Sequence, residues 1–217
     1  MSEFGTMPPS PVSPPDLREW IGGVDIQLVD HILRGTFPSG GIRVLDAGCG
    51  GGRNLLWFLR TGCDVSAVDT SPMAVAQVRS AAEMLAPYLP PENFHVEAVE
   101  EMSFPDASFD VVLSIAVLHF ARDEAQFLGM LEEMWRVLRR GGVLFVRVAS
   151  TIGIEKLVVP LGSPRRYQVP DGSERFLVDL ELLLRLTEGL KGELLDPIKT
   201  VNVQNQRCMT TWVLRKR

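Results

Sequence analysis

The stretch VLDAGCGGGRN, residues 44–54, decides the fold because it sets a glycine-rich loop between an apolar run and a helical pattern. A glycine loop between a strand and a helix lets backbone amides approach a ligand where a Cβ atom would collide. The strict dinucleotide-binding pattern requires a third glycine where Arg53 stands, and no Gly-Lys-Ser/Thr of a P-loop follows. Both a nicotinamide oxidoreductase and a P-loop protein are therefore disfavoured.

Two carboxylates flank this loop. Asp46 precedes the glycines, and Asp69 ends the next apolar run. A carboxylate at the second position can accept hydrogen bonds from both hydroxyl groups of a ribose. Asp46 suits a ligand ammonium group, either directly or through the loop. Together these features predict a ligand that combines a nucleoside with an amino acid.

Apolar runs and helical patterns alternate along most of the chain. Strands are predicted at 42–48, 64–69, 94–99, 109–118 and 143–150, and helices at 16–35, 53–62, 71–88 and 123–142. Ser71 and Pro72 fit the start of one helix, and Gly141 and Gly142 fit the end of another. Runs at 193–203 and 207–215 predict a terminal antiparallel hairpin. We expect an α/β fold with a Rossmann-like, seven-stranded, mostly parallel sheet and helices on both faces.

The domain organisation follows from composition along the chain. Residues 1–15 are expected to be a disordered lead-in, because residues 7–16 contain five prolines, and residues 1–6 resemble vector-derived sequence. Residues 16–217 are expected to form one domain. Within it, residues 150–192 have weak periodicity and several glycines and prolines, which favours an insertion that covers a site.

Overall composition excludes several partners. The formal net charge is −5 and no long basic stretch occurs, so no nucleic acid is expected as a partner. No apolar run is long enough to predict a membrane span. The three cysteines form no CxxC pair, which favours reduced thiols in a cytoplasmic protein without a metal site. The sequence carries no mark of an oligomeric state.

The order of these motifs resembles the class I S-adenosylmethionine-dependent methyltransferases. The resemblance rests on VLDAGCG at 44–50, VD at 68–69, FPDASFDVV at 104–112 and VLRRGG at 137–142. It implies S-adenosylmethionine as cofactor and in-line methyl transfer to a small-molecule acceptor such as a thiol, oxyanion, amine or hydroxyl. The stretches GCGGGRN, GCDVSAVD and TTWVLRKR also resemble the tellurite-resistance group of methyltransferases. The alternative hypothesis is a non-catalytic cofactor-binding scaffold or partner subunit.

The resemblance also implies site residues. Ala98 stands where the family has an acid for the adenine amino group, so Val99 or Glu100 is expected to serve instead. Cys49 is expected to be a small packing residue in the loop. The residues implied to bind the cofactor are Asp46, Gly48, Cys49, Gly50, Asp69, Thr70, Val99, Glu100 and Ser114.

Residues that are candidates for binding or activating the methyl acceptor lie further along the chain. His119 is the histidine expected near the cleft, as a general base if its pKa stays near neutrality or as a structural residue otherwise. Arg165, Arg166 and Tyr167 fall in the predicted insertion and are candidates for clamping an anionic substrate or for a solvated loop.

Overall fold

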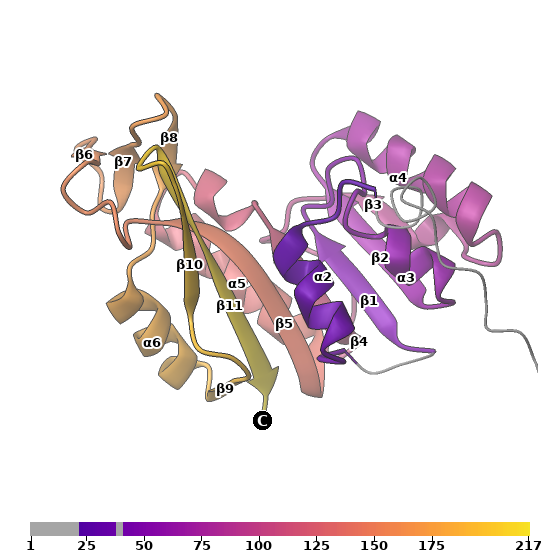
Figure 1. The fold of residues 1–217 in the computed structure, drawn as a ribbon. Helices are drawn as coiled ribbons and strands as arrows, with labels where there is room; N and C mark the ends of the chain where they lie inside the picture. Colours follow the sequence, from indigo (N-terminus) through magenta and orange to yellow (C-terminus); the bar gives the residue numbers. More distant parts are fainter. Residues whose placement is uncertain (1–21, 38–40) are drawn as a thin grey trace, which may run out of the picture.

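The computed structural model describes residues 22–37 and 41–217, so the predicted lead-in over 1–15 lies outside the described residues. Its main feature is a large mixed sheet (Figure 1). The strands of this sheet are β1 (Arg43–Ala47), β2 (Asp64–Asp69), β3 (Phe94–Val96), β4 (Phe109–Ile115), β5 (Leu138–Ser150), β9 (Gly192–Leu194), β10 (Lys199–Val203) and β11 (Arg207–Lys216). Their order is β10-β11-β5-β4-β1-β2-β3, and β9 also pairs with β11.

Strands β1 to β5 run parallel, with β1 between β2 and β4. The carboxyl ends of β1, β2 and β4 therefore meet at one edge of the sheet, and the glycine loop follows β1 at this edge. Strand β11 runs antiparallel to β5. These pairings confirm the predicted Rossmann-like fold class.

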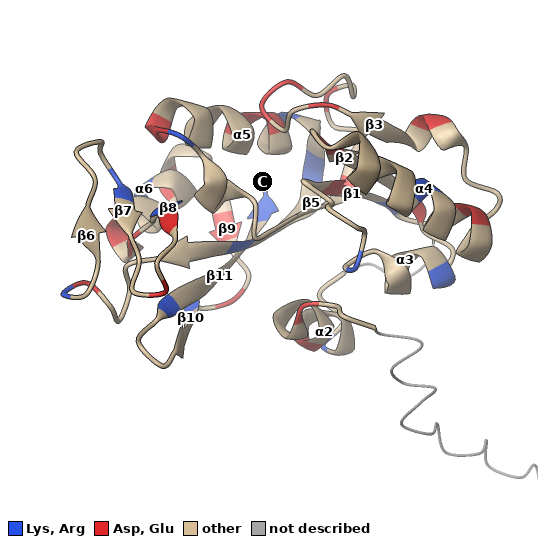
Figure 2. Ribbon diagram, turned by 90° about the horizontal axis from the view of Figure 1, so that it is seen from above, with Lys and Arg blue, Asp and Glu red and all other residues tan. Residues whose placement is uncertain are grey.

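Helices cover both faces of the sheet, as the alternating pattern predicts. Buried side chains of α2 (Ile26–Leu33), α3 (Leu56–Arg60) and α4 (Pro72–Leu85) pack in one apolar cluster with Phe145 of β5. Those of α5 (Glu124–Val137) and α6 (Leu180–Gly189) pack in another with Trp212 of β11. Figure 2 shows α5 and α6 on one side of the sheet and α2 and α3 on the other.

Polar side chains cap α4, α5 and α6, whereas α3 has no side-chain cap. The Ser71 hydroxyl accepts a hydrogen bond from the N–H of Ala74, and Pro72 occupies the first helical position, as predicted. Asp123 and Asp179 cap α5 and α6 with their carboxylates. Each cap satisfies a backbone donor that the helix itself cannot pair, so the caps fix where α4, α5 and α6 begin.

Several predicted boundaries are wrong. Helix α5 ends at Val137 and β5 begins at Leu138, so Gly141 and Gly142 lie within a strand rather than closing the helix. The pairing of β4 with β5 shifts register here, and a Cβ atom on Gly142 would lie 2.9 Å from the Asp110 carbonyl oxygen. The glycines therefore permit a bulge where two backbones approach closely.

The helix predicted at 53–62 is also shorter than expected. Residues before Leu56 form successive turns, in which the Gly52 N–H donates to the Cys49 carbonyl and the Leu55 N–H donates to the Gly52 carbonyl. Strands β3 and β4 likewise end sooner than predicted, at Val96 and Ile115.

The terminal hairpin is present, with β10 antiparallel to β11. The single run predicted at 193–203 is divided into β9 and β10, which pair with different parts of β11. Pro197 lies between them and has no backbone N–H to donate to a ladder, which accounts for the break. This division explains why the described sheet has eight strands rather than the expected seven.

The region 150–192 carries a second, smaller sheet. Its antiparallel strands are β6 (Val159–Pro160), β7 (Arg166–Gln168) and β8 (Glu174–Phe176). Figure 1 shows this small sheet at the same end of the molecule as the turn between β10 and β11. The Asp171 N–H donates to the Gln206 carbonyl, which joins the two segments.

Asp25 joins the first described helix to the sheet. Its Oδ1 accepts from the Gln27 N–H and caps α2, while its Oδ2 lies 3.3 Å from Nε of the buried Arg147 in β5. Its own N–H donates to Oδ1 of Asn54, just after the glycines, over 3.1 Å. One residue thus connects α2, the glycine loop and a central strand.

We expect Asp25→Ala to lower the free energy of unfolding by about 3 kcal/mol, because it removes a helix cap and leaves the Arg147 guanidinium buried without its carboxylate. Asp25→Asn should lower it by about half as much, since the amide oxygen can still cap the helix. Denaturant unfolding measures both. The matched control is Asp30→Ala, which breaks an exposed pair with Arg34. Equal losses for the Asp25 and Asp30 variants would contradict this role.

Candidate functional site

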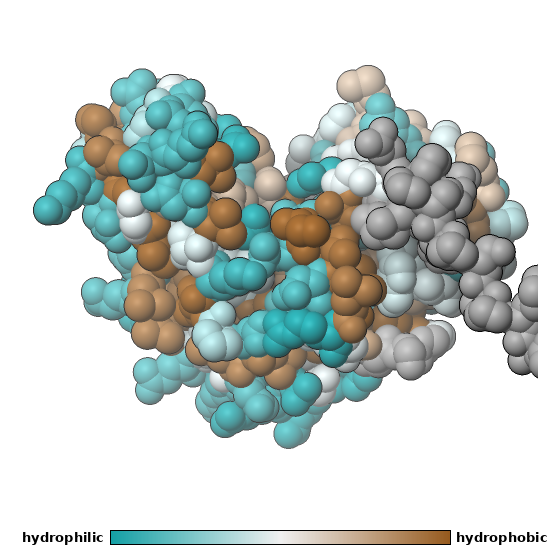
Figure 3. Space-filling model, in the orientation of Figure 1, coloured by the Kyte–Doolittle hydropathy of each residue, from teal (hydrophilic) through white to brown (hydrophobic). Residues whose placement is uncertain are grey.

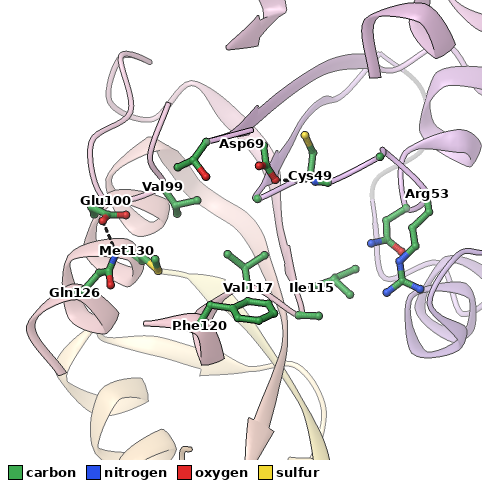
Figure 4. A pocket seen from close by; sticks show the side chains of 16 residues that line it. Cys49, Arg53, Asp69, Val99, Glu100, Ile115, Val117, Phe120, Gln126 and Met130 are labelled. Carbon is green, nitrogen blue, oxygen red and sulfur yellow. Dashed lines mark hydrogen bonds between the residues drawn. The ribbon is translucent and has the colours of Figure 1, made fainter. Parts of the chain in front are cut away.

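A cavity of about 620 Å³ opens at the carboxyl ends of the parallel strands. Figure 4 shows Asp69 and Phe120 on opposite sides of it, Arg53 at one end and Glu100 at the other. The residues that line this first cavity are Gly48, Cys49, Gly50, Gly51, Arg53, Asn54, Asp69, Thr70, Val99, Glu100, Ile115, Ala116, Val117, Phe120, Gln126 and Met130.

The glycine loop forms one wall. Gly48 has φ +87°, and a Cβ atom there would lie 2.5 Å from Val117 Cγ2, so both the backbone conformation and the space require glycine. Gly50 has φ +49°, and a Cβ atom there would meet nothing within 4 Å, so its backbone faces open space. Burial raises the pKa of the Cys49 thiol far above its usual value, which makes this cysteine a poor nucleophile.

Asp69 holds the loop in position. Its Oδ2 accepts from the Gly50 N–H and its Oδ1 from the Ser71 N–H, both over 2.9 Å. The preceding carbonyl, that of Val68, accepts from the N–H groups of Gly48 and Cys49. A carboxylate has about four lone-pair positions, so acceptor capacity remains toward the cavity.

Asp46 is the most perturbed acid of the region. Its side chain is buried, and neither carboxylate oxygen has a hydrogen-bond partner among the described residues. Burial raises its pKa to about 7, opposed by the nearby Arg53 and reinforced by Asp69. Ser114 also has a buried hydroxyl without a partner in the described part of the chain. Both residues adjoin the cavity-lining segments in sequence, but neither is among the residues that line the cavity.

The opposite end of the first cavity is formed by Val99, Glu100 and two residues of α5. The Glu100 carboxylate accepts a hydrogen bond from Gln126 Nε2 over 2.6 Å. Glu100 therefore supplies a held carboxylate at the end where Ala98 lacks one. Sequence reasoning did not find Gln126 or Met130, because only the packing of α5 brings them to this edge.

A second cavity of about 440 Å³ adjoins the first and shares Arg53, Ala116 and Phe120 with it. Figure 3 shows the surface hollowed between the part that carries β6 to β8 and the part that carries α2. Ala116 has φ +63°, an unusual conformation for a residue with a Cβ atom, and its N–H donates to the Arg147 carbonyl. Such backbone strain where the cavities meet is typical of functional sites.

His119 lines the second cavity and is only 5% exposed. Its Nδ1 accepts from the Ala149 N–H over 3.2 Å, so the neutral ring carries its proton on Nε2. Burial lowers its pKa to about 4, and the charges of Arg175 and Arg207 act in the same direction. The ring is therefore neutral near pH 7 and offers a donor rather than a base.

Arg53 and Asn54 have a definite place in the structure. The Arg53 guanidinium donates to the Gly23 carbonyl over 3.2 Å, and Asn54 is buried and bonded to Asp25. Both side chains line the first cavity. They join the segment before α2 to the glycine loop, which no local sequence pattern indicates.

The predicted arginine clamp does not reach either cavity. Arg165 pairs with Asp179, and Arg166 lies near Glu174 and donates to the Ala121 carbonyl. Neither arginine lines the first or the second cavity. The second cavity instead receives Arg175 from β8 and Arg207 from the start of β11.

The residues present fit S-adenosylmethionine. Asp69 presents a carboxylate for ribose hydroxyls, the open space at Gly50 admits a ligand against the backbone, and the unpartnered Asp46 carboxylate favours a cationic group nearby. The fold and this site together fit the class I S-adenosylmethionine-dependent kind of methyltransferase domain that the sequence resembles.

Comparison with known proteins agrees. Residues 45–146 match the family described as a methyltransferase domain. The chain is 37% identical over 131 residues to 2-methyl-6-phytyl-1,4-hydroquinone methyltransferase of Synechocystis sp., over 60% of this chain and 35% of that protein. It is 36% identical over 121 residues to thiol S-methyltransferase TMT1A of Homo sapiens, over 55% of this chain and 47% of that protein. The matches span less than two thirds of the length of these curated relatives.

A solved structure shows the same fold. The Burkholderia thailandensis 1,6-didemethyltoxoflavin-N1-methyltransferase, with bound 1,6-didemethyltoxoflavin and S-adenosylhomocysteine, has a TM-score of 0.64 and 21% identity, covering 93% of this chain and 81% of that one.

Within residues 22–37 and 41–217, no helix combines the length and apolar character needed to cross a membrane.

The buried Asp46 predicts a dependence of stability on pH. Because its folded-state pKa of about 7 lies above the ordinary value of 3.8, it favours folding in acid and loses this contribution as pH rises through 7. In cofactor-free Asp46→Asn we expect this loss to disappear, so that the variant gains about 3 kcal/mol relative to the parent between about pH 4 and about pH 8. Denaturant unfolding at both pH values measures it.

The same variant should bind S-adenosylmethionine about tenfold more weakly, because the carboxylate no longer attracts the ligand's positive charges. Calorimetry measures this, with Asp30→Asn as a control for loss of an exposed carboxylate. Parallel pH curves for parent and Asp46→Asn would show that burial does not raise the pKa of Asp46 in the folded state.

Proposed function

We propose that the protein transfers the methyl group of S-adenosylmethionine to a small-molecule acceptor bound in the second cavity. The supporting observation is that the two cavities meet at shared residues, Arg53, Ala116 and Phe120. A cofactor in one cavity and an acceptor in the other would face each other across this boundary. The acceptor atom is a thiol, oxyanion, amine or hydroxyl.

The first cavity would hold the cofactor in an extended form. Asp69 would accept hydrogen bonds from the ribose, and Val99 and Glu100 would lie at the adenine. Arg53, at the other end of the cavity, would pair with the amino-acid carboxylate. Asp46 would favour the cationic groups of the ligand from its buried position beside the glycine loop.

The chemistry then rests on alignment. Bound S-adenosylmethionine supplies an electrophilic methyl group whose sulfonium charge disappears during the in-line displacement. The chain's own contribution is to orient the nucleophile and to exclude water, which can supply much of the acceleration. Ala116, held in its strained conformation, and Phe120 form the boundary through which the two ligands would meet.

His119 would act on the acceptor as a hydrogen-bond donor. Its Nδ1 is already engaged by the Ala149 N–H, and burial disfavours the charged ring. A dedicated base is unnecessary when the acceptor is an anion or already ionised. His119 lies near the cleft, as expected, but in this role it would orient the acceptor instead of abstracting a proton from it.

Three further points are also proposals: the region 150–192 covers the acceptor, the protein works in a reducing compartment, and the acceptor is a small molecule. Residues Val169, Asp171, Ser173, Arg175 and Leu177 of the region 150–192 line the second cavity, which supports a role for this region in covering the acceptor. Three buried free cysteines suit a reducing compartment such as the cytoplasm. Small acceptors are named for the relatives of this domain, including a hydroquinone and a thiol.

Cofactor binding separates this proposal from a protein of unrelated function. We expect calorimetry to show binding of S-adenosylmethionine by the parent protein and a loss of at least about tenfold in Asp69→Ala, which removes the ribose partner and a support of the loop. Asp69→Asn should lose less, because its amide oxygen still accepts one hydrogen bond. Absence of binding by the parent would overturn the proposal.

Turnover separates an enzyme from a cofactor-binding scaffold. With labelled S-adenosylmethionine and a panel of thiols, phenols, amines, carboxylates and metalloid oxyanions, we expect labelled product from at least one class. Turnover of the oxyanions would favour the tellurite-resistance group. Cofactor binding without transfer to any acceptor would favour the scaffold.

The state of His119 gives a pH prediction. We expect His119→Asn to reduce the single-turnover rate about tenfold through loss of a hydrogen bond, by the same factor from about pH 5.5 to about pH 8. The acceptor's own ionisation affects both rates equally, so it cancels in the ratio of parent to variant rates. A ratio that falls steadily as pH drops through about 6.5 would show instead that His119 acts as a base near its ordinary pKa.

A further inference from the structure

Two of the four arginines that line the second cavity, Arg175 and Arg207, come from segments outside the parallel part of the sheet. Arg175 lies in β8, with its guanidinium carbon 4.8 Å from the centre of the Phe120 ring. Arg207 begins β11 and is exposed. Both residues line the cavity, and the charges of both act on His119 in its wall.

These two cations are not neutralised by an ion pair. In the described part of the chain, neither Arg175 nor Arg207 forms a salt bridge. Arg147 pairs with Asp25, and Asp171, whose Oδ1 accepts from the N–H and the hydroxyl of Ser173, is the carboxylate whose pKa the charges of Arg175 and Arg207 help to lower.

The cavity therefore has a positive excess within an acidic protein. Two arginines face one aspartate, Asp171, which leaves about one uncompensated positive charge, and Arg53 at the boundary adds to it. The whole chain has a formal net charge of −5. A local excess of positive charge in an acidic protein attracts anions.

Apolar side chains line the second cavity beside these charged and polar residues. A ligand body there would contact aliphatic side chains and the Phe120 ring, and the volume of about 440 Å³ suits a small molecule. The apolar side chains concerned are Val169, Leu177, Val201, Val203 and Met209.

We infer that the methyl acceptor is a small organic carboxylate with an apolar body, whose carboxylate is bound by Arg175 and Arg207. This rests on the proposed function, because it assigns the substrate class of the same site. Planar guanidinium groups match a carboxylate in geometry, and with Arg53 paired to the cofactor's carboxylate the one remaining excess charge matches a monoanion better than a phosphate dianion.

Binding measured without turnover tests the inference. The protein loaded with S-adenosylhomocysteine is titrated with para-mercaptobenzoate and para-mercaptobenzamide, and with mercaptohexanoate and mercaptohexanamide. Each pair keeps the body and the thiol and changes the charge. We expect each acid to bind at least about tenfold more tightly than its amide, with a preference that weakens as salt is added.

Substitutions assign that preference to the two arginines. Arg175→Gln and Arg207→Gln should each reduce binding of the acids and leave binding of the amides unchanged, and the double variant should bind acid and amide equally. Arg207→Glu should disfavour the acids further. Arg185→Gln, on the exposed face of α6 and outside both cavities, is the matched control and should keep the full preference.

Each outcome decides the inference. Equal binding of acids and amides, absence of binding by both, or a preference that survives the double variant would overturn it. Tighter binding of phenyl phosphate than of benzoate would overturn it in favour of a phosphate ligand. Methyl transfer to the neutral amides at the same efficiency would leave the proposed function intact and remove the carboxylate clamp. If the parent protein did not bind S-adenosylmethionine, both the proposed function and the carboxylate clamp would be overturned.

Discussion

The carboxylate of Asp69 is the constraint on which the site depends. It accepts the N–H groups of Gly50 and Ser71, so it joins the loop after β1 to the start of α4. The adjacent Val68 carbonyl accepts two more N–H groups of the loop. Because the end of β2 fixes the loop at these points, the loop backbone stays open toward the cavity.

A second network extends this order across the sheet. Asn54, at the end of the glycine stretch, bonds to the backbone of Asp25, whose side chain caps α2 and pairs with Arg147 of β5. Arg147 in turn donates to Thr211 of β11. These contacts connect the wall of the first cavity to strands that line the second cavity. Polar contacts as well as the apolar core therefore fix the position of one cavity relative to the other.

The charges of the two cavities differ in sign, and this difference suits their proposed ligands. The first contains Asp69 and Glu100 in its wall with Asp46 buried nearby, which favours a ligand that carries positive charge. The second has an excess of arginine. A positively charged methyl donor and a negatively charged acceptor would each be attracted to its own side of Ala116, which would reduce unproductive binding in the wrong cavity.

The sequence by itself determined the sheet, the glycine loop and the carboxylate at the end of β2, because these depend on local periodicity and on short spacings from Gly48 to Asp69. The cofactor-binding residues that the spacing and the family resemblance predicted line the first cavity, apart from Asp46 and Ser114, which are buried outside its lining. Only the tertiary structure decided the rest. Gln126, Arg175 and Arg207 reach the cavities through long-range packing, Gly141 serves a bulge instead of a helix end, and burial among neighbours from several elements keeps His119 neutral. Such properties depend on which segments meet in space, and no local pattern of residues encodes that.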